Sequence, residues 1–142
     1  MIMKRFEFVD ITTADVAFKA FGKDLSELFA NAGLAMFEVI IDTKQVKAKV
    51  SRKVKAKADD LQALMFNWLN ELLVFVDSEN LAFSKFDVKV DEKNLSLTAV
   101  CKGEKIDSKR HEVRTAVKAA TYHKLEVKKA KGRWQCQVIL DI

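Results

Sequence analysis

The chain contains no proline and only four glycines in 142 residues, which argues against long flexible linkers. Its two cysteines show no metal-ligand spacing, and each alternates with apolar neighbours. Cys101 and Cys136 are therefore predicted to be buried thiols rather than a disulfide or a nucleophile. A glycine-rich phosphate loop, a Cys/His metal ladder and a serine-centred nucleophile elbow are also absent from the sequence. These absences argue against a self-sufficient nucleotide-using enzyme.

Apolar runs of membrane-spanning length are missing too, because Asn67, Asn70 and Glu71 interrupt the longest candidate. The N-terminus leads into a short alternating run instead of the apolar region of a signal peptide. We therefore expect a cytoplasmic protein that makes no contact with a membrane. The length fits one domain, predicted over residues 1–142.

Basic residues are only mildly in excess over acidic ones, and the formal net charge is +5. Lysines alternate with apolar residues from Val46 to Ala58, a pattern typical of a strand with one solvated face. No recognised RNA-binding motif accompanies this basic excess. We expect any RNA contact to be indirect, and direct RNA binding by this lysine face is the least favoured alternative.

Hydrophobic periodicity predicts two helices among several strands. Asp24 is placed to cap a helix that extends to Ile40, and Asp59-Asp60 are placed to cap a second helix whose apolar stripe begins at Leu61. That stripe is interpreted as core, with a partner-binding face as the alternative. Strands are predicted at Arg5–Asp10, Asp15–Phe21, Val46–Ala58, Phe83–Val90, Leu95–Lys102, Leu125–Lys128 and Trp134–Asp141. Three hairpins are predicted: the first two strands, Phe83–Val90 with Leu95–Lys102, and Leu125–Lys128 with Trp134–Asp141 across Ala130-Lys131-Gly132. Because most strands join as hairpins, the predicted fold is α+β: two main helices packed on a largely antiparallel β-sheet in a single two-layer domain.

The last predicted strand ends in two neighbouring anions, the side chain of Asp141 and the α-carboxylate of Ile142. Adjacent carboxylates become favourable only with protons, basic side chains or a hard cation nearby. Asp15 begins its strand on the polar face. If the two strands are neighbours, the three carboxylates converge as an oxygen cluster that suits Ca²⁺, Mg²⁺ or Mn²⁺ better than Zn²⁺. The alternative is a turn aspartate and a solvated chain end.

A second polar group runs from Glu104 to Glu112 and mixes both charge signs, so a solvated loop is the default interpretation. An acid–base pair of His111 and His123 is the chemical alternative. Neither histidine has a nucleophile or an orienting carboxylate placed beside it by the sequence.

Short stretches in a characteristic order extend along nearly the whole chain. They are Thr13-Ala14-Asp15-Val16, Gly22-Lys23-Asp24-Leu25, Ala35-Met36-Phe37-Glu38-Val39, Ala58-Asp59-Asp60-Leu61, Asn67-Trp68-Leu69-Asn70-Glu71-Leu72-Leu73, Gly103-Glu104-Lys105-Ile106-Asp107, Lys109-Arg110-His111, Val117-Lys118-Ala119, Thr121-Tyr122-His123 and Asp141-Ile142. In order and spacing they resemble the archease family. No single stretch is very specific, and the resemblance lies in their combination.

The resemblance implies an accessory protein rather than a catalyst. Archeases assist RtcB-type RNA ligases in tRNA splicing by promoting ligase guanylylation and multiple turnover. The family's metal site corresponds here to Asp15, Asp141 and Ile142, with Ca²⁺ as the expected cation and Mg²⁺ or Mn²⁺ as alternatives. Thr12 stands where relatives commonly have histidine, so any role of that histidine is absent or altered. The resemblance also implies a second possible role, as a chaperone or specificity modulator of a tRNA methyltransferase.

Overall fold

The structure, a computed structural model, describes residues 4–11 and 15–142. Its helices are α1 (Leu25–Ile40) and α2 (Leu61–Glu79), and η1 (Thr43–Gln45) is a short 3₁₀ turn. Its strands are β1 (Phe6–Val9), β2 (Val16–Gly22), β3 (Val50–Lys57), β4 (Leu81–Asp91), β5 (Ser96–Lys105), β6 (Ala119–Ala120), β7 (Glu126–Ala130) and β8 (Arg133–Asp141). Within these two ranges, no helix is long and apolar enough to cross a membrane.

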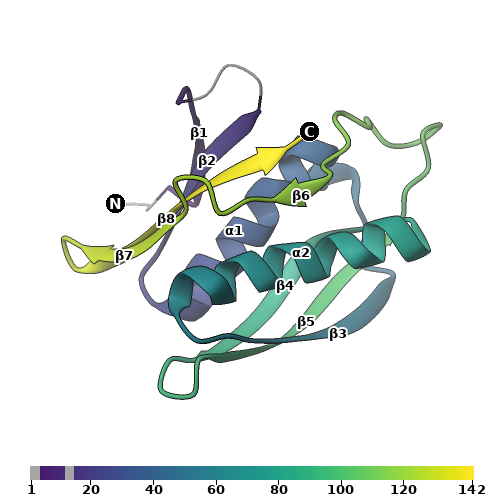
Figure 1. Cartoon of the computed structure of the whole chain (residues 1–142). Helices are drawn as coiled ribbons and strands as arrows, with labels where there is room; N and C mark the ends of the chain where they lie inside the picture. The colour runs from purple at the N-terminus through teal and green to yellow at the C-terminus, as the bar shows by residue number, and fades with distance from the viewer. Residues whose placement is uncertain (1–3, 12–14) are drawn as a thin grey trace.

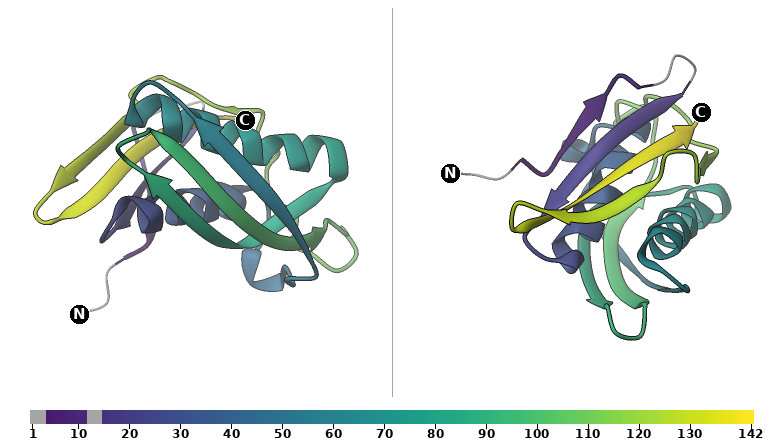
Figure 2. Two further views of the ribbon diagram at one scale, coloured as in Figure 1. Left: turned by 90° about the horizontal axis from the view of Figure 1, so that it is seen from below. Right: turned by 60° about the vertical axis from the view of Figure 1, so that its left-hand side comes forward.

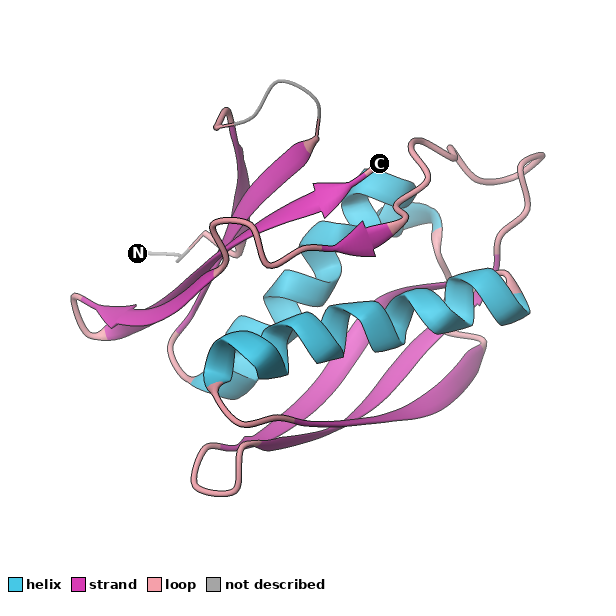
Figure 3. Ribbon diagram, viewed as in Figure 1, coloured by secondary structure: helices cyan, strands magenta, loops and turns pink. Residues whose placement is uncertain are grey.

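In the described part of the chain, the strands form two antiparallel sheets. One has the order β1-β2-β8-β6, with β7 also paired to β8, and the other has the order β3-β5-β4. The helices lie between the sheets, since α1 packs against β2 and β4 while α2 packs against β3 and β6 (Figures 1 and 3). The α+β class and the two helices packed on antiparallel strands are confirmed. The expected single sheet is divided in two, so the expected two layers become three.

The burial of α1 gives a physical reason for this division. Its buried residues cover an arc of about 200° around the helix, wider than the stripe of a helix that packs on one surface, and such a helix needs cover on more than one side. On the β4 side the approach is close, because a Cβ atom added at Gly33 would lie 3.1 Å from the ring of Phe86. A single sheet would cover only one of these sides.

Both predicted N-caps are confirmed. The Asp24 carboxylate accepts a hydrogen bond of 2.8 Å from the backbone N–H of Glu27, and Asp60 accepts one of 2.7 Å from the N–H of Ala63. Each bond satisfies one of the donors that the first turn of a helix leaves unpaired.

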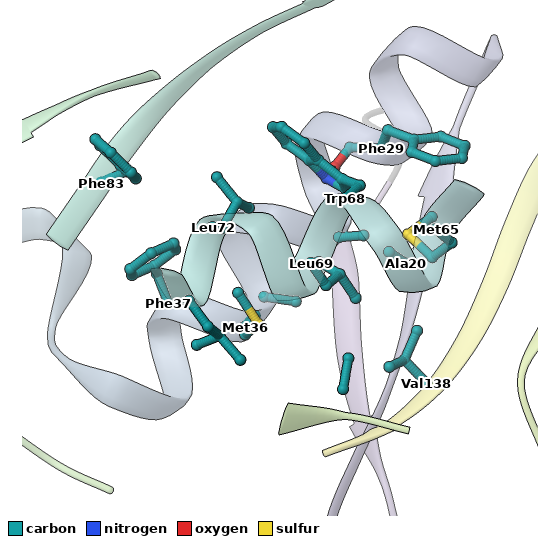
Figure 4. Packing of buried hydrophobic residues seen from close by; sticks show 14 of the residues in the cluster. Ala20, Phe29, Met36, Phe37, Met65, Trp68, Leu69, Leu72, Phe83 and Val138 are labelled. Carbon is teal, nitrogen blue, oxygen red and sulfur yellow. The ribbon is translucent and has the colours of Figure 1, made fainter. Parts of the chain in front are cut away.

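The apolar stripe of α2 belongs to the core, as its interpretation required. Its largest member, Trp68, has no exposed surface and donates its indole N–H to the backbone oxygen of Phe29 on α1 at 2.9 Å. Figure 4 shows this contact and the neighbouring side chains of both helices facing Ala20 of β2 and Val138 of β8. One buried cluster therefore joins the helix pair to the sheet that carries the end of the chain.

The hairpins of β4 with β5 and of β7 with β8 are confirmed, and β4 and β5 are longer than predicted. Lys131 and Gly132 turn β7 into β8 with positive φ angles of 54° and 76°, the conformation of a tight two-residue hairpin turn. The predicted hairpin of the first two strands is also confirmed, while its turn at residues 12–14 lies outside the described residues.

The strand predicted from Val46 begins only at Val50. The N–H of Lys47 donates to a carboxylate oxygen of Glu104 at 2.8 Å, and the N–H of Lys49 donates to the oxygen of Gly103 at 2.9 Å. Residues before Val50 therefore use their donors on two separate partners instead of a continuous ladder.

Candidate functional site

The strands that carry Asp15 and Asp141 are direct neighbours. β2 and β8 pair antiparallel from Gly22 opposite Trp134 to Val16 opposite Leu140. One further step in this register places Asp15 opposite Asp141. Figure 1 accordingly shows the C-terminal end of β8 beside the beginning of β2. The condition that the sequence set for convergence, that the two strands be neighbours, is met.

The side-chain faces also follow the prediction. Phe18 and Ala20 of β2 belong to the buried cluster between the sheets, so the alternate residues Asp15 and Lys19 have the opposite direction. By the same alternation, Val138 and Leu140 point into the core and Asp141 points away from it. Asp15, Asp141 and Ile142 are all partly exposed.

The opposite edge of β8 is held by β6. Ala119 pairs with Asp141 and Ala120 with Leu140. The N–H of Lys118 donates to the backbone oxygen of Asp141 at 2.7 Å, so the last strand is paired to β6 up to this residue and to β2 up to Leu140. This pairing fixes the backbone from which the Asp141 carboxylate projects.

The side chain of Asn70 on α2 holds β6 in turn. Its Oδ1 accepts the N–H of Ala120 at 2.9 Å, and its Nδ2 donates to the oxygen of the same residue at 3.2 Å. Asn70 thereby completes the two backbone bonds that another strand would have made to Ala120. Sequence reasoning missed both β6 and this contact, and the only available signal was a polar residue near the apolar stripe of α2.

The donor set at the end of β8 is chemically suited to a hard divalent cation. Two side-chain carboxylates and one terminal carboxylate offer only oxygen, the ligand atom that Ca²⁺ and Mg²⁺ prefer. Among residues 4–11 and 15–142, no three His, Cys, Asp or Glu side chains gather closely enough to hold a metal ion. A site here therefore depends on the carboxylate of Ile142 as its third group. Thr12 lies outside the described residues.

The second polar group is only in part the solvated loop that the sequence suggested, because residues 107–110 and Glu112 are exposed but Glu104 and His111 are buried. The side chains of Glu104 and His111 are only 5% and 0% exposed. The N–H of Asp107 donates to Nδ1 of His111 at 2.9 Å, which places the ring proton on Nε2, 3.0 Å from Glu104. Arg110 also donates to the Glu104 carboxylate. The mixed charges of this segment gave no sign of a buried network, because only the folded loop after β5 brings its members together.

This network lowers the pKa of Glu104. Burial by itself raises the pKa of the carboxyl group, but hydrogen bonds from the Lys47 N–H, His111 and Arg110 outweigh it and lower the value to about 2. The carboxylate thus stays ionised and ties the loop to the chain before β3. His111 is committed to this contact, while His123 is exposed on the connection from β6 to β7. The structure gives the alternative of a His111–His123 pair no support.

The connection from this network to β6 is also anchored to the C-terminal end of α1. The N–H groups of Arg114 and Thr115 donate to the oxygens of Ile40 and Val39 at 2.8 and 3.0 Å, and the Arg114 guanidinium donates to the oxygen of Glu38 at 2.9 Å. These donors satisfy carbonyls that the last turn of a helix leaves unpaired. The segment that leads to Lys118 is therefore fixed before it reaches Asp141.

Both cysteines are confirmed as buried free thiols. Cys101 is 0% and Cys136 is 2% exposed, and burial raises the pKa of each thiol to about 12. A thiol that remains protonated in this way is a poor nucleophile and a poor metal ligand.

Comparison with known proteins finds one family over nearly the whole chain. The sequence model of the archease protein family (MTH1598/TM1083) matches residues 6–142. The chain is 48% identical to protein archease of Methanothermobacter thermautotrophicus over 142 residues, covering 99% of this chain and 100% of the relative. It is 44% identical to protein archease of Sulfurisphaera tokodaii over 140 residues, with the same two coverages.

Solved structures have the same fold. The solution structure of Methanobacterium thermoautotrophicum protein 1598 superposes with a TM-score of 0.86 at 47% identity, covering 99% of this chain and 100% of the other. A crystal structure from Thermotoga maritima, described as an archease and possible chaperone, has a TM-score of 0.66 at 21% identity and covers 92% and 93% of the two chains. At that identity the second likeness concerns the fold alone.

Proposed function

The chain belongs to the archease family, and we propose that it is a cytoplasmic accessory protein that activates an RtcB-type RNA ligase in tRNA splicing. In this role it promotes guanylylation and repeated turnover of the ligase without forming a covalent bond to the RNA or the nucleotide. The sequence supports such a division of labour, since it lacks the phosphate loop and nucleophile motifs of a self-sufficient enzyme.

The observation that carries the proposal is the register of β2 and β8, which ends at Val16 opposite Leu140 and, continued by one residue, brings Asp15 opposite Asp141. We assign Asp15, Asp141 and the carboxylate of Ile142 as ligands of a divalent cation, with Ca²⁺ first and Mg²⁺ or Mn²⁺ as alternatives. When bound, such a cation supplies fixed positive charge of the kind that stabilises phosphoryl-transfer transition states.

The contribution of the chain itself is positional. Asp141 projects from a strand that is paired on both sides, to β2 and to β6. The backbone that carries this carboxylate is therefore already held in place before a partner arrives. We propose that this end of the sheet docks near the ligase active site, where it helps to organise ligase groups or nucleotide phosphates.

Single substitutions test the ligand assignment. In Asp15→Asn and Asp141→Asn, one carboxylate becomes an amide of the same shape, while Asp59→Asn is a matched control at an exposed residue before α2. Titration calorimetry with Ca²⁺ on the isolated protein should show at least about a tenfold loss of affinity in the first two variants only. Multiple-turnover ligation and guanylylation with the purified ligase should fall in parallel. A folded Asp141→Asn variant that binds Ca²⁺ and stimulates the ligase normally would refute the assignment.

The terminal carboxylate is tested separately. Two additional residues after Ile142 move the carboxylate away while they leave both aspartates and every strand contact in place. We expect the same loss of Ca²⁺ affinity and of ligase stimulation. Full stimulation by the extended chain would remove Ile142 from the site, with Asp15 and Asp141 still to be judged by their own variants.

A second role, which the family resemblance in the sequence also implies, is that of a chaperone, the word used in the description of the Thermotoga maritima protein. By this proposal the chain protects or redirects a tRNA methyltransferase instead of activating a ligase. A purified methyltransferase heated with and without the protein separates the two. A larger soluble fraction or a changed modification site, with ligase guanylylation unaffected, supports the chaperone role, whereas no effect on the methyltransferase excludes it.

A further inference from the structure

The outer face of the three-stranded sheet, on the side away from the helices, is unusually basic. In Figure 2, left, this sheet lies in front of the helices. The registers of β3, β5 and β4 place one residue in two of each strand on this face. Six of the outward residues are lysines: Lys53, Lys55 and Lys57 of β3, Lys85 and Lys89 of β4, and Lys102 of β5. We refer to this surface as the basic face.

The basic face carries most of the excess charge of the chain. Its acidic residues are Asp87 and Asp91, so its formal charge is +4, compared with +5 for the whole sequence. Asp91 is already used at the β4–β5 turn, where its carboxylate accepts hydrogen bonds from the N–H and side-chain amide of Asn94 at 3.2 and 2.7 Å. All six lysines are exposed. The positive charge is thus concentrated on one side of the molecule.

Five of the lysines stand in two lines, on β3 and on β4, and a neutral strip of β5 (Ser96, Thr98 and Val100) lies between them. Lys102 lies at one end of this strip. Lys55 of β3 and Lys89 of β4 both lie opposite Thr98, which belongs to the central strand β5. Along a strand, residues of one face are about 6.6 Å apart, and adjacent strands are separated by about 4.8 Å. The two lines are therefore about 10 Å apart, and shallow hollows between them reach down to Thr98 and Val100.

We propose that the basic face binds the sugar–phosphate backbone of a structured RNA directly. A chain of phosphates lying along the β5 strip meets ammonium groups on both sides, the arrangement that provides sequence-independent affinity by releasing counterions. The outward residues of these three described strands include no aromatic side chain. Base stacking of the kind that single strands use is therefore not provided, and the contact is with the backbone of a helical RNA.

The same composition disfavours an acidic protein as the occupant. Protein interfaces usually contain aromatic or arginine anchors in an apolar centre, whereas the centre of this face is Ser96, Thr98 and Val100. The earlier expectation that RNA contact is indirect relied on the alternation of one strand. The topology adds Lys85, Lys89 and Lys102 from two other strands, which no inspection of residues 46–58 would place beside them.

The experiment compares two variants of equal charge. The basic-face variant loses three charges from the basic face through Lys53→Gln, Lys55→Gln and Lys89→Gln. The control variant loses three exposed charges from other parts of the structure through Lys23→Gln, Lys44→Gln and Lys131→Gln. Binding of an unmodified tRNA transcript to the isolated protein is measured by fluorescence anisotropy at about 50 to 200 mM salt. No ligase is present, so the result is independent of the proposed function.

We expect the basic-face variant to bind at least about tenfold more weakly than the wild type at low salt. The slope of log Kd against log salt concentration should fall by about two to three in this variant. The control variant should change much less in both quantities. Equal losses in the two variants would attribute binding to net charge and overturn the proposal. Failure of the wild type to bind the transcript, or unchanged RNA binding by the basic-face variant, would overturn it as well.

Discussion

The contact between Asn70 and β6 gives a prediction whose size follows from the structure. The variant Asn70→Ala removes both side-chain partners of the Ala120 backbone. The N–H of Ala120 loses its acceptor Oδ1 at 2.9 Å, and the oxygen of Ala120 loses its donor Nδ2 at 3.2 Å. A third bond, from Asn70 to the oxygen of Phe66, is lost as well. Ala120 is only 2% exposed, so water cannot easily replace these partners.

Each intramolecular hydrogen bond contributes about 0.5–1.5 kcal/mol net, and a buried group left without a partner costs more. We therefore expect Asn70→Ala to lower the free energy of unfolding by about 2–3 kcal/mol. For a chain of this size, that loss corresponds to a fall in Tm of roughly 5–10 °C. Asn67→Ala on the same helix is the matched control, because its side chain makes one exposed hydrogen bond, to the oxygen of Lys57.

Two measurements check this prediction. Urea titration gives the free energy of unfolding of both variants, and hydrogen exchange reports on the amide of Ala120. That amide should exchange faster in Asn70→Ala and remain protected in Asn67→Ala. Equal destabilisation of the two variants, with unchanged protection of Ala120, would refute the view that Asn70 holds β6 beside Asp141.

Two further predictions concern the elements around the site. Because the pKa of Glu104 is about 2 in the folded state and 4.5 for an ordinary glutamate, its stabilising contribution is complete above about pH 4.5 and is lost as the pH falls towards 2. Unfolding free energies measured across this range should therefore converge for wild type and Glu104→Gln, and a constant difference would contradict the assignment. Gly103→Ala should destabilise the protein by about 3 kcal/mol or more in a thermal melt, because its Cβ would lie 1.8 Å from the backbone oxygen of Ala82. An unchanged Tm would show that β4 and β5 can separate at little cost.

The features that local pattern predicts are those that depend on neighbouring residues. Asp24 and Asp60 cap their helices through bonds to residues three positions away, and Trp68 lies in a stripe with helical spacing. The tight turn at Lys131 and Gly132 likewise needs only its own sequence. Each of these predictions is confirmed because it depends on residues that are close to one another in the sequence.

The features that pattern missed depend on distant partners. Lys47 continues the alternation of the strand after it, but its N–H binds Glu104, 57 positions away, and the strand starts later. The two residues of β6 are too few to show a period, and they are held by Asn70 from 50 positions away. In each case the chain follows a contact that no window of local sequence contains.

The candidate site depends both on local sequence and on contacts between distant segments, so the sequence predicts only part of it. Strand alternation predicts that Asp15 and Asp141 lie on faces directed away from the core, because that property is local, and both residues are partly exposed. Their meeting depends on which strand pairs with β8 and in which register, and a shift of one residue would have turned one carboxylate inward. In the observed structure β8 pairs with β2, and the register is not shifted in this way. A substitution that changes the register, rather than the carboxylates, should therefore abolish Ca²⁺ affinity with all three proposed ligands still present in the chain.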